Sequence, residues 1–225
     1  MLVQNFIYEA LPVRVIFGSG TVAQVKKEAE HLGIRRALVL STPGRGEAQA
    51  REIAALLGDC AGGVLASAVM HTPTEVTEQA MQVVKEREAD GIVAVGGGST
   101  TGLGKAIALR TDLPQIVLPT TYAGSEMTPI LGETTGGKKT TQRNLKALPE
   151  VVIYDVDLTM SLPPAIAATS GINAIAHAVE AHYARNRNPV ISLMAEEGIA
   201  ALARALPRIA EDPLDREARS DALYG

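Results

Sequence analysis

The sequence predicts an α/β fold followed by a purely helical region, and two observations carry that prediction. Short apolar runs alternate with helical patterns from residue 14 to about residue 120, as in chains of βαβ units. After the Ser-Leu-Pro-Pro run at 161–164 no strand pattern recurs, and apolar residues repeat at intervals of three and four. We therefore expect a parallel-sheet, Rossmann-like domain at residues 1–160 and the start of an all-helical domain at residues 161–225.

Six segments have the short, apolar and β-branched character of buried parallel strands. They are Arg14–Phe17, Ala37–Leu40, Gly63–Ser67, Ile92–Val95, Ile116–Leu118 and Val151–Tyr154.

The intervals between these strands carry helical periodicity, and we expect helices at Val22–Leu32, Glu47–Leu57, Thr74–Glu88 and Thr101–Leu109. Gly33 is expected to close the first helix in a left-handed conformation. Thr72 is expected to cap the third, with Pro73 at its first position and Glu75 reaching back.

The alternation stops between Tyr122 and Pro149, where Gly136-Gly137 has the composition of a hairpin tip. Such a hairpin would project from the sheet and cover a site. Beyond residue 164 we expect helices at Ile166–Ala181, Ser192–Leu206 and Asp215–Tyr224. About sixty helical residues carry apolar faces, and these faces have few helices within the same region to pack against. We therefore expect the helical domain to be truncated.

Composition narrows the classes of partner. Lys and Arg number 21 against 25 Asp and Glu, a net charge of −4, which favours neither nucleic acid nor an anionic membrane surface. A single cysteine, Cys60, excludes an internal disulfide. The N-terminal residues have no signal-peptide pattern, and no apolar run is long enough to span a bilayer. We expect a cytoplasmic protein whose partners are small molecules and copies of itself, as a homodimer.

The strongest local feature is a buried strand that runs into Gly96-Gly97-Gly98-Ser99 at the start of a helix. Glycines let the backbone approach a pyrophosphate closely, and the free amides and dipole of a helix N-terminus favour its negative charge. A glycine cluster that only makes a tight turn is the alternative, because the spacing differs from the usual dinucleotide-binding pattern.

The next strand ends in Thr120, Thr121, Tyr122 and Ser125. These hydroxyls lie at the carboxyl edge of the predicted sheet, where ligands bind in open α/β folds, and they are candidates for contacts with ribose, amide or phosphate. An ordinary polar loop is the alternative.

In the helical region, Asn173 and His177 are four residues apart and share one helix face. A metal ion could contact both, but asparagine is a weak neutral ligand and few other histidines are available. We therefore expect no metal site.

Four motifs in this order resemble the iron-containing alcohol dehydrogenase superfamily, and within it the maleylacetate reductases. They are GGGSTTGLGKAIAL at 96–109, LPTTYAGSEMTPILGE at 118–133, PEVVIYDVDLTMSLPP at 149–164 and ATSGINAIAHAVEAHYA at 168–184. Gly102 stands where the superfamily usually has Asp, which is typical of the reductase branch, while Lys105 is retained. Asn173 and His177 match the first two metal-ligand positions of the superfamily, whose first ligand is usually Asp.

The resemblance implies reduction of maleylacetate, a small dicarboxylate, to 3-oxoadipate with NADH or NADPH, late in the degradation of aromatic compounds. Hydride would go to the olefinic carbon, and a metal would not be required. As catalytic candidates it suggests Lys105, Tyr122 and His177. As cofactor-binding candidates it suggests Thr42, Gly96, Gly97, Gly98, Ser99, Thr120, Thr121, Ser125 and Lys139.

Cofactor preference depends on Thr42, in the turn after the second strand. An acidic residue is frequent there in the superfamily and would repel a 2′-phosphate, whereas threonine carries no charge. We expect both NADH and NADPH to serve. A metal-dependent alcohol dehydrogenase and a nucleotide-binding fragment without turnover are the two alternatives to the reductase.

Overall fold

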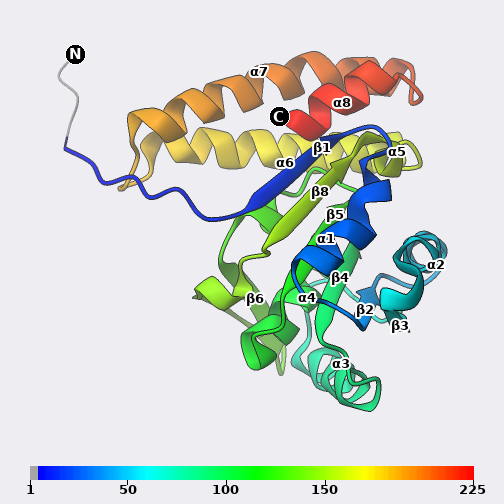
Figure 1. Ribbon diagram of the computed structural model, residues 1–225. Helices are drawn as coiled ribbons and strands as arrows, with labels where there is room; N and C mark the ends of the chain where they lie inside the picture. The colour runs from blue at the N-terminus through cyan, green and yellow to red at the C-terminus, as the bar shows by residue number, and fades with distance from the viewer. Residues whose placement is uncertain (1–4) are drawn as a thin grey trace. The chain divides into compact units, whose positions relative to one another are not determined.

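The computed structural model describes residues 5–225, which form two compact units. The sheet unit contains Val13–Thr120 and Gly124–Asp155, and the helical unit contains Val156–Gly225 together with residues 5–12 and Thr121–Ala123. Figure 1 labels the strands and helices of the sheet unit and the helices of the helical unit. The domain boundary expected at residue 160 stays a prediction.

The sheet unit is built on six strands in the order β1-β8-β5-β4-β2-β3, and every neighbouring pair is parallel. Each expected strand is present. The strands are β1 (Arg14–Gly18), β2 (Ala37–Leu40), β3 (Ala61–Leu65), β4 (Gly91–Gly96), β5 (Gln115–Pro119) and β8 (Val151–Asp155).

The third strand begins and ends two residues earlier than expected, since Ala61 and Gly63 pair with Ala37 and Leu38. A Cβ on Gly62 would lie within 3.0 Å of the Arg36 side chain. Glycine at this position therefore allows the close approach of the neighbouring strand.

Four helices cover the sheet: α1 (Val25–His31), α2 (Arg45–Leu57), α3 (Thr74–Glu86) and α4 (Gly98–Thr111). Helix α1 contacts α2, and α3 contacts α4. The largest described apolar cluster under α3 and α4 joins Leu38, Leu40 and Ile92 of the sheet to Leu103 and Ile107 of α4. Buried residues on both sides of the strands explain why the strand sequences are continuously apolar.

The start of the first helix and the capping of the third differ from what the sequence predicts, although the third helix begins at Thr74 as expected. The first helix begins as a 3₁₀ turn at Thr21–Gln24, where Asp155 accepts hydrogen bonds from the amides of Gly20 and Val22 at 3.1 and 2.7 Å. The third begins at Thr74 with Pro73 as its N-cap and no side-chain cap hydrogen bond. Thr72 is instead buried with φ of 45°, a backbone conformation in which it cannot serve as the expected capping residue.

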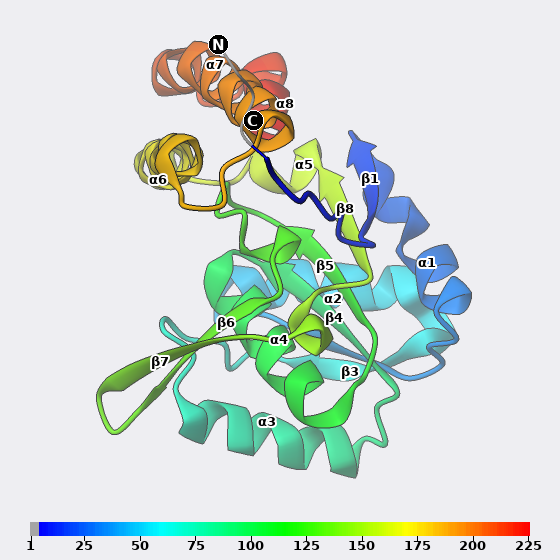
Figure 2. The same cartoon turned by 90° about the vertical axis from the view of Figure 1, so that its left-hand side faces the viewer.

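The expected hairpin is confirmed. Strands β6 (Ile130–Thr135) and β7 (Lys138–Arg143) pair antiparallel around Gly136-Gly137, whose φ values of 55° and 79° suit a two-residue turn. Figure 2 shows this hairpin projecting beside α3. The turn end of the hairpin is tied to the segment before α3, because the Thr134 amide, close to Gly136, donates to the Thr72 carbonyl at 3.2 Å.

The helical unit contains α5 (Val156–Thr159), α6 (Pro164–Tyr183), α7 (Pro189–Glu211) and α8 (Arg216–Tyr224). Helix α7 packs against both α6 and α8. The buried Arg219 guanidinium donates to the carbonyls of Leu162 and Pro213 at 2.9 and 3.0 Å and so joins the start of α8 to the segment before α6. Along residues 5–225, none of the helices is both long and apolar enough to cross a bilayer.

Candidate functional site

The carboxyl end of β4 passes directly into helix α4. The helix begins at Gly98, three residues earlier than expected, so that Ser99 belongs to its first turn. Gly96 has φ of 154°, and a Cβ there would lie within 3.0 Å of the Thr100 hydroxyl. The amides of this first turn lack helical partners and carry the positive end of the helix dipole. The segment therefore offers an anion-binding backbone that only glycine can form at Gly96.

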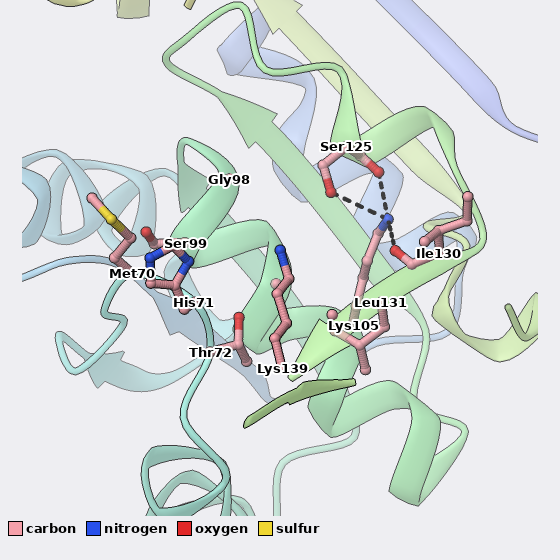
Figure 3. Close-up of a pocket in the computed structure, with 12 residues that line it drawn as sticks. Met70, His71, Thr72, Gly98, Ser99, Lys105, Ser125, Ile130, Leu131 and Lys139 are labelled. Atoms are coloured by element: carbon pink, nitrogen blue, oxygen red, sulfur yellow. Dashed lines mark hydrogen bonds between the residues drawn. The ribbon is translucent and has the colours of Figure 1, made fainter. Parts of the chain in front are cut away.

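A pocket of about 350 Å³ opens beside this helix start (Figure 3). All of its lining belongs to the sheet unit and comes from four places: the turn before α3, helix α4, the loop after β5 and the hairpin. The lining residues are Met70, His71, Thr72, Gly98, Ser99, Gly102, Lys105, Ser125, Ile130, Leu131, Gly132 and Lys139.

Five of the predicted site residues meet in this pocket: Gly98, Ser99, Lys105, Ser125 and Lys139. Figure 3 shows the Lys139 side chain extending from the hairpin into the space between Ser99 and Lys105. Two lysines and a helix N-terminus give the pocket a positive character, which suits an anionic ligand.

Lys105 is fully buried and its ammonium is surrounded by main-chain oxygens. The Nζ atom donates to the carbonyls of Ser125, Thr128 and Ile130, the last two at 2.7 and 3.0 Å. Burial lowers the pKa of Lys105 to about 8, and the negative charge of Glu126 opposes that change. The catalytic role expected for Lys105 stays a prediction, and its contacts show that it fastens the loop after β5.

A buried carboxyl lies behind the same loop. Glu126 is 3% exposed and accepts a hydrogen bond from the Tyr154 hydroxyl at 2.9 Å. Burial raises the pKa of Glu126, while the Tyr154 hydrogen bond and the Lys105 charge lower it. Burial also raises the pKa of Tyr154. No local pattern pairs these residues, since 28 positions separate them and the contact depends on the fold.

His71 and Thr72 also line the pocket but were not among the predicted site residues. Both have positive φ, 68° and 45°, which is uncommon for residues with side chains and is often found at functional sites. The Thr-Pro pair predicts a helix start, and α3 does begin at Thr74, but no local pattern predicts the positive φ of the two residues before Pro73.

The other predicted residues lie elsewhere. Thr42 is half-buried in the turn between β2 and α2, outside the pocket lining. The Thr120 amide donates to the Gly96 carbonyl at 3.0 Å and links the ends of β5 and β4. Thr121, Tyr122 and His177 belong to the helical unit, so their roles beside Gly97 and the rest of the glycine loop stay predictions.

Three buried hydroxyls in the sheet unit have no hydrogen-bond partner within the described structure: Ser41, Ser67 and Thr100. Ser41 and Ser67 follow the adjacent strands β2 and β3, and Thr100 is in the first turn after β4. All three therefore occur at the carboxyl edge of the sheet. Unsatisfied buried hydroxyls at this edge fit a site that receives a polar ligand.

Two residues of α6 stand at the expected metal-ligand positions. The side chains of Asn173 and His177 lie on the exposed surface of α6, and the His177 Nδ1 is 3.3 Å from Glu180 Oε2. Within residues 5–225, no group of three or more His, Cys, Asp or Glu side chains is arranged to hold a metal.

Comparison with known proteins gives two family matches. Residues 12–156 match the iron-containing alcohol dehydrogenase model, and residues 167–225 match the model of the C-terminal part of that family. Maleylacetate reductase from Rhizobium sp. (strain MTP-10005) is 57% identical over 99% of this chain. The chain spans 63% of that relative.

Solved structures show the same relationship. The crystal structure of maleylacetate reductase from Agrobacterium tumefaciens is 56% identical with a TM-score of 0.95, and the match covers 98% of this chain and 63% of that one. Sulfoacetaldehyde reductase from Bifidobacterium kashiwanohense, solved in complex with NAD⁺, is 25% identical with a TM-score of 0.92 over 98% of this chain and 64% of its own. The chain belongs to the iron-containing alcohol dehydrogenase family.

Proposed function

We propose that this chain carries the cofactor-binding part of an NAD(P)H-dependent reductase that converts maleylacetate to 3-oxoadipate. The observation that carries the proposal is the pocket in which the first turn of α4, Lys105 and Lys139 converge. Relatives 57% identical over nearly the whole chain are named maleylacetate reductases, and a structural neighbour was solved with NAD⁺, which supports the choice of substrate and cofactor.

The residues fit a dinucleotide. Gly96 has positive φ and lets the Thr100 side chain pack against the end of β4, and the amides of the α4 first turn suit a pyrophosphate. Lys139 supplies a positive charge to the same pocket. Ser125 is proposed to lie toward the nicotinamide with Thr120 and Thr121. When bound, the reduced nicotinamide supplies a hydride to the olefinic carbon of the substrate.

The chain's own residues have two tasks in this reaction. Negative charge that develops on the substrate as it accepts hydride needs cationic or hydrogen-bonding neighbours and a proton donor. His177 and Tyr122 are proposed for these tasks, since each can donate a proton and both belong to the helical unit. The reaction is proposed without a metal, because Asn173 offers a neutral amide at the position where the superfamily's first metal ligand is an anionic Asp.

The test begins with titration of the 225-residue chain with NADH, followed by nicotinamide fluorescence. Lys139→Met is expected to weaken binding about tenfold through the loss of a charged contact. Lys138→Met is the matched control. Lys138 is the neighbouring residue of β7 and does not line the pocket, so this variant is expected to bind like the wild type. Equal effects of the two variants would contradict the assignment of the pocket.

Turnover is tested separately by adding maleylacetate and following the loss of reduced nicotinamide. Substrate-dependent oxidation of NADH by the wild-type chain is the expected result. Cofactor binding without turnover would instead favour a nucleotide-binding fragment. Failure to bind either NADH or NADPH would overturn the proposed function altogether.

A further inference from the structure

The ammonium of Lys105 is enclosed by one short segment of main chain. It contacts the carbonyl oxygens of Ser125, Thr128 and Ile130, and the Thr128 Oγ1 lies 3.1 Å away. An ammonium group has three N–H donors, and three carbonyls are present to receive them. We call these three carbonyls the carbonyl cage.

The segment that forms the carbonyl cage has little regular structure of its own. It contains the 3₁₀ turn Ser125–Met127 and then passes through Pro129 to the start of β6. Two side-chain contacts from other elements hold it: Lys105 reaches its carbonyls from α4, and Tyr154 of β8 donates to Glu126. A segment with few backbone ties depends on such contacts for its shape.

The segment that forms the carbonyl cage also lines the ligand pocket. Ser125 and Ile130 line the pocket together with Lys105, as Figure 3 shows by the hydrogen bonds between them. The three N–H groups of the Lys105 ammonium already donate to carbonyls, so none is available for a bound ligand. Lys105 therefore affects a ligand indirectly, by holding the Ser125–Ile130 segment in place. Lys139, in contrast, lines the same pocket from the hairpin and is available for direct contact with an anion.

We propose that Lys105 is a positioning residue whose ammonium shapes the Ser125–Ile130 wall of the pocket, and that a free alkylammonium ion can occupy the carbonyl cage when the side chain is removed. The role in cofactor binding rests on the proposed function, whereas occupation of the cage does not.

Lys105→Ala removes three methylene groups and the ammonium, which together correspond to the n-propylammonium ion. In this variant, NADH binding is expected to weaken about tenfold or more, as expected for the loss of hydrogen bonds to a charged group. Propylammonium chloride is expected to restore most of that loss. Tetramethylammonium chloride at equal ionic strength is the control, because it carries the same charge with no N–H donor and is expected to restore nothing.

A second measurement does not depend on the cofactor. Propylammonium is expected to raise the thermal unfolding temperature of Lys105→Ala above the value in tetramethylammonium, with no such difference for the wild type or for Lys105→Met. The methionine side chain fills the alkyl space but offers no N–H, so it also reports on the fold if the alanine variant is poorly stable. A folded Lys105→Met with weakened NADH binding supports the proposal.

The outcomes distinguish a failure of the proposed function from a failure of the role proposed for Lys105. The wild-type chain could fail to bind NADH while propylammonium still stabilises Lys105→Ala specifically. This result would contradict the proposed function and support occupation of the carbonyl cage. If the wild type binds NADH and neither variant changes that affinity, Lys105 has no positioning role. Absence of any difference between the two ammonium ions in both measurements overturns the cage.

Discussion

Gly102 lies so close to Thr72 that a Cβ on the glycine would come within 3.0 Å of the threonine hydroxyl. Both residues line the pocket, Gly102 from α4 and Thr72 from the turn before α3. Thr72 is buried with positive φ, which leaves its side chain little freedom to move. The two residues thus fit together only because one of them has no side chain.

Gly102→Ala is therefore expected to lower the free energy of unfolding by about 1–2 kcal/mol and to weaken NADH binding, because overpacking displaces the turn that lines the pocket. Urea unfolding and NADH titration measure the two effects. Gly104→Ala is the matched control two residues along α4. A Cβ there meets its neighbours at 3.5 Å or more, so the better helix propensity of alanine is expected to leave the stability unchanged or raised.

A second-site change sharpens this test. Thr72→Gly removes the hydroxyl and suits the positive φ, so in combination with Gly102→Ala it is expected to restore stability relative to Gly102→Ala alone. Strict additivity of the two substitutions would show that the contact between residues 72 and 102 does not cause the defect.

The fold was largely predictable because its signals are local. Six apolar strands, the helices between them and the Gly136-Gly137 turn all follow from spacing within short windows of sequence. The place of Gly98 and Ser99 in the pocket was equally predictable, since both residues are adjacent to the strand that presents them.

The remainder of the pocket depends on contacts that no short window contains. The motif identifies Lys105 as a site residue. The hydrogen bonds from its ammonium to three carbonyls, however, depend on the path of residues 125–130. The strained turn at His71 and Thr72 arises because the Thr134 amide of the hairpin bonds to it, 62 positions away in the chain. Such positions satisfy tertiary contacts at the expense of local preference.

Tyr154→Phe is expected to destabilise the protein in a pH-dependent manner. The Tyr154 hydroxyl donates to buried Glu126, and this hydrogen bond is stronger when the carboxyl is ionised. Burial raises the pKa of Glu126 in the folded protein above its value in the unfolded chain. The stability that the protonated carboxyl contributes is therefore fully present below the unfolded-state pKa, and it is lost as the pH rises through the folded-state pKa. Loss of the hydrogen bond raises that pKa further.

Urea unfolding at about pH 5 and about pH 7.5 checks this expectation, with a loss of about 1–3 kcal/mol for Tyr154→Phe that is larger at the higher pH. Glu126→Gln is the control, since an amide does not titrate and removes this part of the pH dependence. A loss for Tyr154→Phe that is equal at both pH values would show that Glu126 is not ionised in the folded protein.

The affinity for NADH is expected to fall as the pH rises above about 8. Burial lowers the pKa of Lys105 to about 8, and the neutral amine that forms above this value has only two N–H groups for three carbonyls. Glu126 favours the charged form from the far side of the loop, and Lys139 is the other cation of the pocket. Titration of NADH across this range measures the effect.

Two variants separate the contributions to this pH profile. Lys105→Met is expected to give a profile that is flat around pH 8, whereas Lys139→Met is expected to bind more weakly but to retain the fall. Retention of the fall in Lys105→Met would assign it to another group.

Thr42→Asp is expected to make cofactor binding selective for NADH. The Thr42 side chain lies beside the first turn of α2, since a Cβ on Gly46 would come within 3.0 Å of its hydroxyl. In folds of this kind the ribose of the nucleotide binds at the end of the second strand. A carboxylate there accepts hydrogen bonds from the ribose hydroxyls and repels a 2′-phosphate.

The measurement is the ratio of the NADH and NADPH dissociation constants for the wild type, Thr42→Asp and Thr42→Ser. The aspartate variant is expected to lose about tenfold or more in NADPH affinity, a repulsion of at least about 1.4 kcal/mol, with NADH binding nearly unchanged. Thr42→Ser keeps the hydroxyl without the charge and is expected to behave like the wild type. Equal losses for both cofactors in Thr42→Asp would mean that residue 42 disturbs the turn and does not contact the ribose.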